Sequence, residues 1–261
     1  MDLGINDHVA VVMGAGGGLG GAIAKSLAAE GVAIAACDID EAAAKRLCET
    51  LSAAGHRAHA FKLDLNQLDS FEDVVASIRN QLGPVSILVN NSGGPPPTTA
   101  AGVDPELWRK HFEGMVLSLI RFTDLVLPDM RERMWGRIIT STSSGVIAPI
   151  PNLAISNALR MSLVGWSKTL AAEVAAEGIT VNVVLPGRIS TDRIRFLDEA
   201  RAKREGKTLA DVEGESTGSI PVHRYGRPEE YGDVVAFLAS RNASFITGST
   251  IRVDGGMIAS L

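Results

Sequence analysis

The chain of 261 residues is long enough for one large α/β domain or two small ones, and 46% hydrophobic residues with 27 glycines suit a folded core better than a disordered or fibrous chain. A net charge of −5 without a stripe of Lys and Arg argues against a nucleic-acid partner. Two cysteines, Cys37 and Cys48, make no disulfide framework, and neither a basic leader nor an apolar run of about 18 residues occurs, so we expect a cytoplasmic protein with no membrane span.

Apolar runs of strand length alternate with amphipathic segments of helix length along the whole chain. The predicted strands are 8–13, 32–37, 58–63, 85–90, 136–141, 180–185 and 250–253, and the predicted helices are 19–30, 40–54, 68–82, 105–133, 152–177 and 228–240. Apolar strands separated by helices are typical of a parallel sheet covered on both faces. Because no linker or composition break interrupts this pattern, we predict one domain over 1–261, a Rossmann-type doubly wound sheet of about seven strands.

Two segments stand outside this alternation. Residues 188–219 are charged and irregular, and we predict a substrate loop that acts as a lid or is disordered. The stiff run Pro95-Pro96-Pro97 follows the fourth strand. Because ligands bind at the carboxyl ends of parallel strands, this run is expected to line a pocket.

The run Gly14-Ala15-Gly16-Gly17-Gly18-Leu19-Gly20 lies between the first strand and the first helix. Such a loop turns sharply, lets a pyrophosphate approach the backbone and points helix N–H groups at the anion. Asp38 ends the second strand, where a carboxylate accepts hydrogen bonds from the ribose hydroxyls and repels a 2′-phosphate. With no arginine in the glycine loop or directly after Asp38, the sequence favours NAD(H) over NADP(H).

Further motifs follow in order along the chain. Asn90-Asn91-Ser92-Gly93 closes the fourth strand, Pro186-Gly187 with Thr191 follows the sixth, and Asp254-Gly255-Gly256 lies near the end. Together with the glycine loop, these motifs resemble the short-chain dehydrogenase/reductase family, nearest in overall look to 3-oxoacyl-carrier-protein reductase-like members. The resemblance implies a small-molecule substrate, a homotetramer, no metal, and cofactor contacts from Gly14, Gly16, Gly18, Leu19, Gly20, Asp38, Ile39, Asp64, Leu65, Asn91, Ser92, Gly93, Arg160, Pro186, Gly187, Ile189 and Thr191.

The catalytic motif of that family is altered here. Ser143 matches the family's catalytic serine, and the Tyr-x-x-x-Lys positions thirteen residues later read Ser156 and Arg160. A phenol titrates near pKa ~10, and a neighbouring lysine cation lowers that pKa toward working pH. A serine hydroxyl is too weak an acid for this task, and an arginine stays charged and cannot shuttle a proton. By count, Met115 replaces the family's asparagine on the long helix.

Three interpretations follow from this altered motif. The chain is an atypical NAD(H)-dependent oxidoreductase in which Ser143, Ser156 and Arg160 form the site, or a silent NAD(H)-binding redox sensor or non-catalytic subunit, or a scaffold that binds no nucleotide. The intact glycine loop argues against the third interpretation. For the first, substitute proton donors would be His111, His223 or Tyr225, and Arg188 or Arg193 would select an anionic substrate.

Overall fold

The computed structural model describes residues 2–260 and is built around one sheet of seven strands in the order β3-β2-β1-β4-β5-β6-β7. All neighbouring strands run parallel. The strands are β1 (Val9–Met13), β2 (Ala33–Asp38), β3 (Ala58–Lys62), β4 (Ile87–Asn90), β5 (Gly136–Ser141), β6 (Ile179–Pro186) and β7 (Thr250–Val253). This architecture confirms the predicted doubly wound α/β fold.

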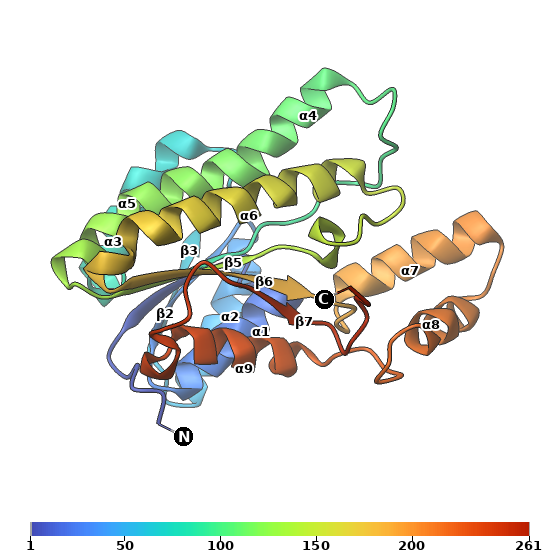
Figure 1. The fold of residues 1–261 in the computed structure, drawn as a ribbon. Coiled ribbons are helices and arrows are strands. Elements are labelled where there is room, and N and C mark those ends of the chain that lie inside the picture. Colours follow the sequence, from blue (N-terminus) through green and yellow to red (C-terminus); the bar gives the residue numbers. More distant parts are fainter. Residues whose placement is uncertain (1, 261) are drawn as a thin grey trace.

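Helices cover both faces of the sheet (Figure 1). They are α1 (Gly18–Ala29), α2 (Glu41–Ala53), α3 (Phe71–Leu82), α4 (Pro105–Phe112), α5 (Ser118–Glu132), α6 (Ala154–Val174), α7 (Asp192–Glu205), α8 (Leu209–Gly218) and α9 (Pro228–Ala239). Within residues 2–260, no helix is both long and apolar enough to cross a bilayer.

The sheet is buried on both faces because alternate residues of each strand point to opposite sides. In β1, Val9, Val11 and Met13 pack with α3, α5 and α6, whereas Ala10 and Val12 pack with α1 and α9. All five residues of β1 are buried. The continuous apolar run in the sequence is therefore the signature of a central parallel strand.

The predicted single helix over 105–133 is wrong in one respect. The chain forms α4, then a π-helical turn η2 (Glu113–Leu117), then α5. A π-helical turn widens the helix by one residue. Gly114 lets this turn pack against Asn66, because a side chain at position 114 would meet Asn66 Oδ1 at 2.6 Å. Met115, which stands where the family's asparagine was expected, lies buried in this turn.

The predicted irregular loop over 188–219 contains two helices, α7 and α8, which stand beyond the carboxyl end of β6 (Figure 1). The spacing of apolar residues in the sequence did not predict these two helices, because neither has an apolar stripe along one face. Thr191 caps α7, and Thr208 with Asp211 forms a capping box at α8.

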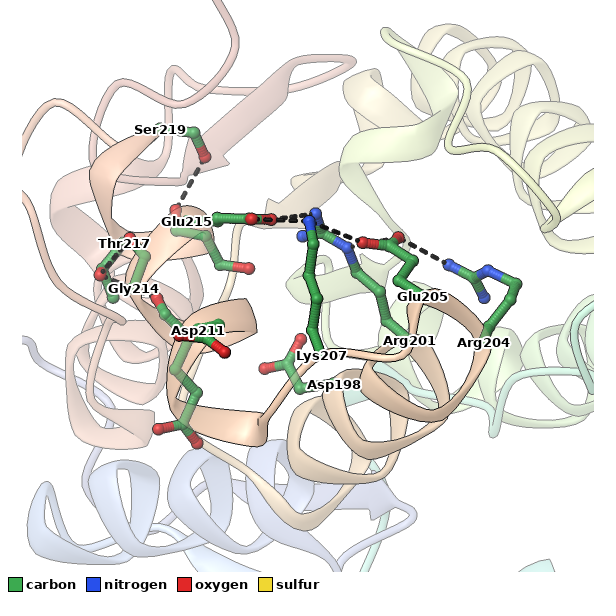
Figure 2. A network of polar contacts seen from close by, with 12 residues as sticks. Asp198, Arg201, Arg204, Glu205, Lys207, Asp211, Gly214, Glu215, Thr217 and Ser219 are labelled. Carbon is green, nitrogen blue, oxygen red and sulfur yellow. Dashed lines mark hydrogen bonds and ion pairs between the residues drawn. The ribbon is translucent and has the colours of Figure 1, made fainter.

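Ion pairs connect the two helices of this segment, and Figure 2 shows the network that they form. Arg201 Nε lies 2.9 Å from Glu205 Oε1, and Lys207 Nζ lies 2.6 Å from Glu215 Oε1. Because Arg201 also pairs with Glu215, the network ties α7 to α8. The charges that suggested a solvated loop are the contacts that join the two helices.

Candidate active site

The predicted site residues meet at the carboxyl edge of the sheet. The strand order reverses between β1 and β4, since β2 and β3 lie on one side of β1 and β4 to β7 on the other. In doubly wound sheets, the crevice at this reversal is where ligands bind. The glycine loop follows β1, Asp38 ends β2, and the loops after β4, β5 and β6 complete the edge.

The glycine loop is packed too closely for side chains at the positions that match the motif. Gly14 has a φ of 63°, and a side chain on Gly20 would lie 2.0 Å from the Gly14 carbonyl oxygen. A side chain on Gly18 would lie 2.6 Å from the methyl carbon of Thr191, the residue that caps α7. The loop is therefore a cradle of bare backbone at the start of α1, which fits a pyrophosphate.

Asp38 joins the glycine loop to the start of α2. Its carboxylate accepts hydrogen bonds from Gly16 N at 2.8 Å and from Asp40 N at 2.9 Å. Each carboxylate oxygen retains a second lone pair for a ribose hydroxyl. Ile39, the next residue, is 60% exposed, so it is free to contact a bound base. Asp64 after β3 accepts from Asn66 N at 2.9 Å.

Arg160 lies buried between the loop after β4 and the end of β5. Its guanidinium donates to the carbonyl oxygens of Ser92 at 3.1 Å, Gly93 at 3.2 Å and Ser141 at 3.3 Å. Burial lowers the pKa of Arg160 to about 10, so the side chain stays charged at neutral pH. These contacts hold the loop after β4 against the end of β5.

Several hydroxyl groups gather at the same edge without a complete set of partners. Ser143 Oγ accepts from Gly145 N at 3.1 Å, which leaves its own proton free to donate. Ser156, in the first turn of α6, is only 7% exposed and its hydroxyl has no partner within residues 2–260. The buried oxygens Ser92 Oγ and Thr142 Oγ1 also have no partner in the described chain. Buried polar atoms of this kind indicate a place for a ligand or ordered water.

Both tyrosines of the chain are engaged in hydrogen bonds elsewhere. Tyr225 donates from its hydroxyl to Asp198 Oδ2 at 2.8 Å, and Asp198 also pairs with Arg188. Tyr231 on α9 is fully buried, with its hydroxyl 2.8 Å from Ser141 Oγ, and burial raises its pKa. The sequence analysis did not predict this hydrogen bond between Tyr231 and Ser141. The only indication in the sequence was a single hydroxyl-bearing residue among the apolar positions of the last helix.

The two candidate histidines contribute no contact to this group. His111 lies on α4, where partial burial lowers its pKa. His223 is exposed and has a φ of 53°. Neither forms a side-chain hydrogen bond in the part of the chain that the structure describes.

Pro186, Gly187 and Ile189 lie where the chain leaves β6, as the motif predicts. Gly187 N donates to Val253 O at 2.9 Å, and a side chain on Gly187 would lie 2.6 Å from Asp254 Cα. This close approach explains the glycine at position 187, whereas Gly255 and Gly256 have positive φ angles of 62° and 84°. On the opposite side of the crevice, Asn91 Nδ2 donates to Met13 O at 3.1 Å and joins the loop after β4 to β1.

Comparisons with known proteins agree with this geometry. The family described as "Enoyl-(Acyl carrier protein) reductase" matches residues 14–258. The chain is 36% identical to nodulation protein G of Azospirillum brasilense over 97% of this chain and 99% of that protein, and 37% identical to 3-oxoacyl-(acyl-carrier-protein) reductase of Escherichia coli over 95% and 96%.

Solved structures show the same fold over the same length. L-sorbose reductase from Gluconobacter frateurii, complexed with NADPH and L-sorbose, superposes with a TM-score of 0.94 at 32% identity, and all of both chains is covered. YwfH, an NADPH-dependent reductase involved in bacilysin biosynthesis, superposes with a TM-score of 0.92 at 28% identity over 97% of this chain and 99% of that one.

Proposed function

Because this chain belongs to the short-chain dehydrogenase/reductase family, we propose that it is an NAD(H)-dependent oxidoreductase that transfers hydride to or from a small carbonyl or alcohol substrate through an atypical active site. The cradle of Gly14, Gly18 and Gly20 at the start of α1 supports nicotinamide-dinucleotide binding. When bound, the reduced cofactor supplies two electrons and one hydrogen nucleus as hydride.

The preference for NAD(H) rests on Asp38. Two similar structures are named with NADPH, which is what those proteins bind. In this chain a carboxylate ends β2 next to the glycine loop, and its hydrogen bond from Gly16 N fixes it there. A 2′-phosphate at that place would meet a like charge, whereas ribose hydroxyls would find an acceptor.

The observation that carries the atypical site is the set of three carbonyl oxygens bound by Arg160. An arginine held in this way positions the loop after β4 against the end of β5 and does not act in proton transfer. In our proposal, Ser143 donates a hydrogen bond to the substrate oxygen, and Ser156 holds a water molecule in the space that a larger side chain would fill.

The proposed reduction is balanced without a protein acid. The hydride that the reduced cofactor would supply forms the C–H bond at the carbonyl carbon, and the π electrons of the C=O bond move to oxygen. That oxygen takes its proton from a water molecule, which leaves as hydroxide. Because no tuned acid assists, we expect turnover about a hundred- to ten-thousand-fold below that of an assisted reductase.

A second candidate function is a silent NAD(H)-binding sensor or subunit. It is favoured by the commitment of both tyrosine hydroxyls, Tyr225 to Asp198 and Tyr231 to Ser141. The test is NADH oxidation with a panel of small ketones, aldehydes and oxo acids, measured for the natural chain and for Ser143→Ala. Slow turnover that Ser143→Ala abolishes supports the enzyme, whereas NADH binding without turnover above background supports the sensor.

We further infer that α7 and α8 form a lid on the substrate side. Thr191 at the start of α7 lies against Gly18. Arg193, two residues later, donates to the Pro95 carbonyl oxygen in the loop after β4. The buried Asp198 of α7 forms an ion pair with Arg188 and accepts a hydrogen bond from Tyr225, and these contacts attach the lid to the rest of the domain. The start of α7 therefore contacts both the glycine loop and the loop after β4.

A further inference from the structure

One arginine at the mouth of the site lacks an acidic partner. Arg193, in the first turn of α7, donates from Nη2 to the carbonyl oxygen of Pro95 at 2.9 Å. Its guanidinium carbon lies 5.7 Å from the centre of the Phe196 ring. Within residues 2–260, its other N–H groups have no hydrogen-bond partner, and Asp192 beside it forms no ion pair with it.

This lack of a partner sets Arg193 apart from its neighbours. Arg188 is paired with the buried Asp198, and the remaining arginines of α7 pair with glutamates. Those pairs are Arg195 with Glu199, Arg201 with Glu205 and Glu215, and Arg204 with Glu205. Of the two arginines that the sequence suggested for an anionic substrate, Arg188 is neutralised by the protein and Arg193 is not.

A second arginine without an acidic partner in the described chain, Arg160, binds the same loop as Arg193. Arg160 donates to Gly93 O, two residues before the carbonyl of Pro95 that Arg193 holds. Burial is the main cause that lowers the pKa of Arg160, and the positive charge of Arg193 adds to that lowering. Two like charges that hold one short loop through neutral carbonyls repel each other, and a bound anion would offset that repulsion.

We propose that Arg193 binds a carboxylate on the substrate, so that the site selects oxo acids and hydroxy acids over neutral ketones and alcohols. This specificity rests on the proposed function. A carboxylate accepts two parallel N–H bonds from a guanidinium, which a backbone carbonyl cannot do. As in the proposed function, Ser143 would then donate to the oxygen that reacts, and Ser156 would hold the water molecule.

The test uses two probes of matched shape, butyrate and butyramide, which differ in charge. Their dissociation constants are measured by ligand-observed NMR for the free protein and again after NADH is added to the same samples. The variants are Arg193→Gln, Arg193→Lys to keep the charge, and Arg195→Gln as a control on the same helix. Arg195 is exposed and already paired with Glu199.

We expect butyrate to bind the natural chain and Arg195→Gln at least about tenfold more tightly than butyramide, as for a charge-assisted contact. Arg193→Gln should bind the two probes equally, and Arg193→Lys should keep most of the difference. Equal binding of the probes to the natural chain would overturn the proposal. So would an Arg193→Gln variant that only weakens NADH, because the anion at Arg193 would then be the pyrophosphate of the cofactor. Failure of NADH to bind in samples where butyrate discrimination persists would reject the proposed function instead.

Discussion

Ser156 and Arg160 lie one turn apart on α6, yet the protein surrounds them differently. Arg160 is fully engaged by the carbonyl oxygens of Ser92, Gly93 and Ser141, whereas the Ser156 hydroxyl has no partner within residues 2–260. In our proposal, these two residues therefore do not act together as a proton-transfer pair. Arg160 holds the loop after β4 against the end of β5, and the Ser156 hydroxyl is left free to bind a water molecule or a ligand.

The double variant Ser156→Tyr with Arg160→Lys tests this interpretation. If only these two residues limit proton transfer, carbonyl reduction should rise at least about tenfold, because a phenol beside a lysine cation is an effective acid. Initial rates of NADH oxidation give the result. Arg160→Lys alone is the control, and it should lower thermal stability without raising the rate. No gain in the double variant would show that the pocket has been reshaped elsewhere.

His8, far from the site, gives a prediction for pH dependence. Its ring stacks 3.9 Å from Trp135, and burial, followed by the charges of Arg133, Arg241 and Arg137, lowers its pKa to about 4. The unfolded chain takes up this proton near pH ~6.5, before the folded chain does. The free energy of unfolding should therefore fall as the pH drops from about 6.5 to about 4.

We expect His8 to contribute about 1–2 kcal/mol to this loss, less than the full shift implies because solvent screens the half-exposed ring. Urea unfolding at both ends of the range, for the natural chain and for His8→Gln, isolates the contribution. The variant keeps a partner for the Ser86 hydroxyl, which lies 2.9 Å from His8 Nδ1. An identical loss in both proteins would show that other groups cause the acid sensitivity.

Hydrogen bonds between distant residues were the least predictable feature at the residue scale. The roles of Asp38 and Asp40 follow directly from position, since Asp38 ends β2 and Asp40, the first residue of the predicted helix 40–54, caps α2. The link from Tyr225 to Asp198 joins residues on two separate segments, and no local pattern predicts it. For that reason the sequence suggests Tyr225 as a candidate acid, whereas in the structure its hydroxyl binds Asp198 of α7.

At the scale of elements, the junction between β1 and α1 is the most demanding piece of backbone. Gly20→Ala would place a methyl group 2.0 Å from the Gly14 carbonyl oxygen. We expect a loss of about 1–3 kcal/mol in unfolding free energy, because the backbone must shift, together with loss of NADH binding. Thermal unfolding and NADH fluorescence measure the two effects.

Gly17→Ala provides the matched control in the same loop. A methyl group there meets no atom closer than the Gly14 carbonyl oxygen at 3.8 Å. This variant should change stability by less than about 0.5 kcal/mol and should keep NADH binding. If the two alanine variants behaved alike, close packing of the loop would not be the reason for its glycines.

Helices with an apolar face were predictable from the sequence, and helices held by charge were not. The alternation of apolar residues located α3 and α6 because they cover the sheet. In α7 the pairs Arg195–Glu199 and Arg201–Glu205 replace that stripe, so the pattern indicated an irregular loop. The π-helical turn η2 was also missed, because a one-residue widening leaves the apolar spacing nearly unchanged.

At the scale of the whole molecule, strand order brings distant motifs to one edge. The reversal between β1 and β4 places the loops after β1, β2, β4, β5 and β6 side by side, although they span most of the chain. The sequence predicted this assembly because each motif follows an apolar strand. The chemistry at the edge was harder to predict, since it depends on which side chains the surrounding backbone has already engaged.

The most direct test is a fluorescence titration of the purified protein with NADH and, in parallel, with NADPH. We predict NADH binding in the micromolar range, roughly −8 kcal/mol at 1 μM, and NADPH binding at least about tenfold weaker because of Asp38. Equal or tighter binding of NADPH would contradict the role of Asp38. Binding of neither nucleotide would contradict the central claim that this chain keeps its cofactor site while its proton-transfer pair is replaced.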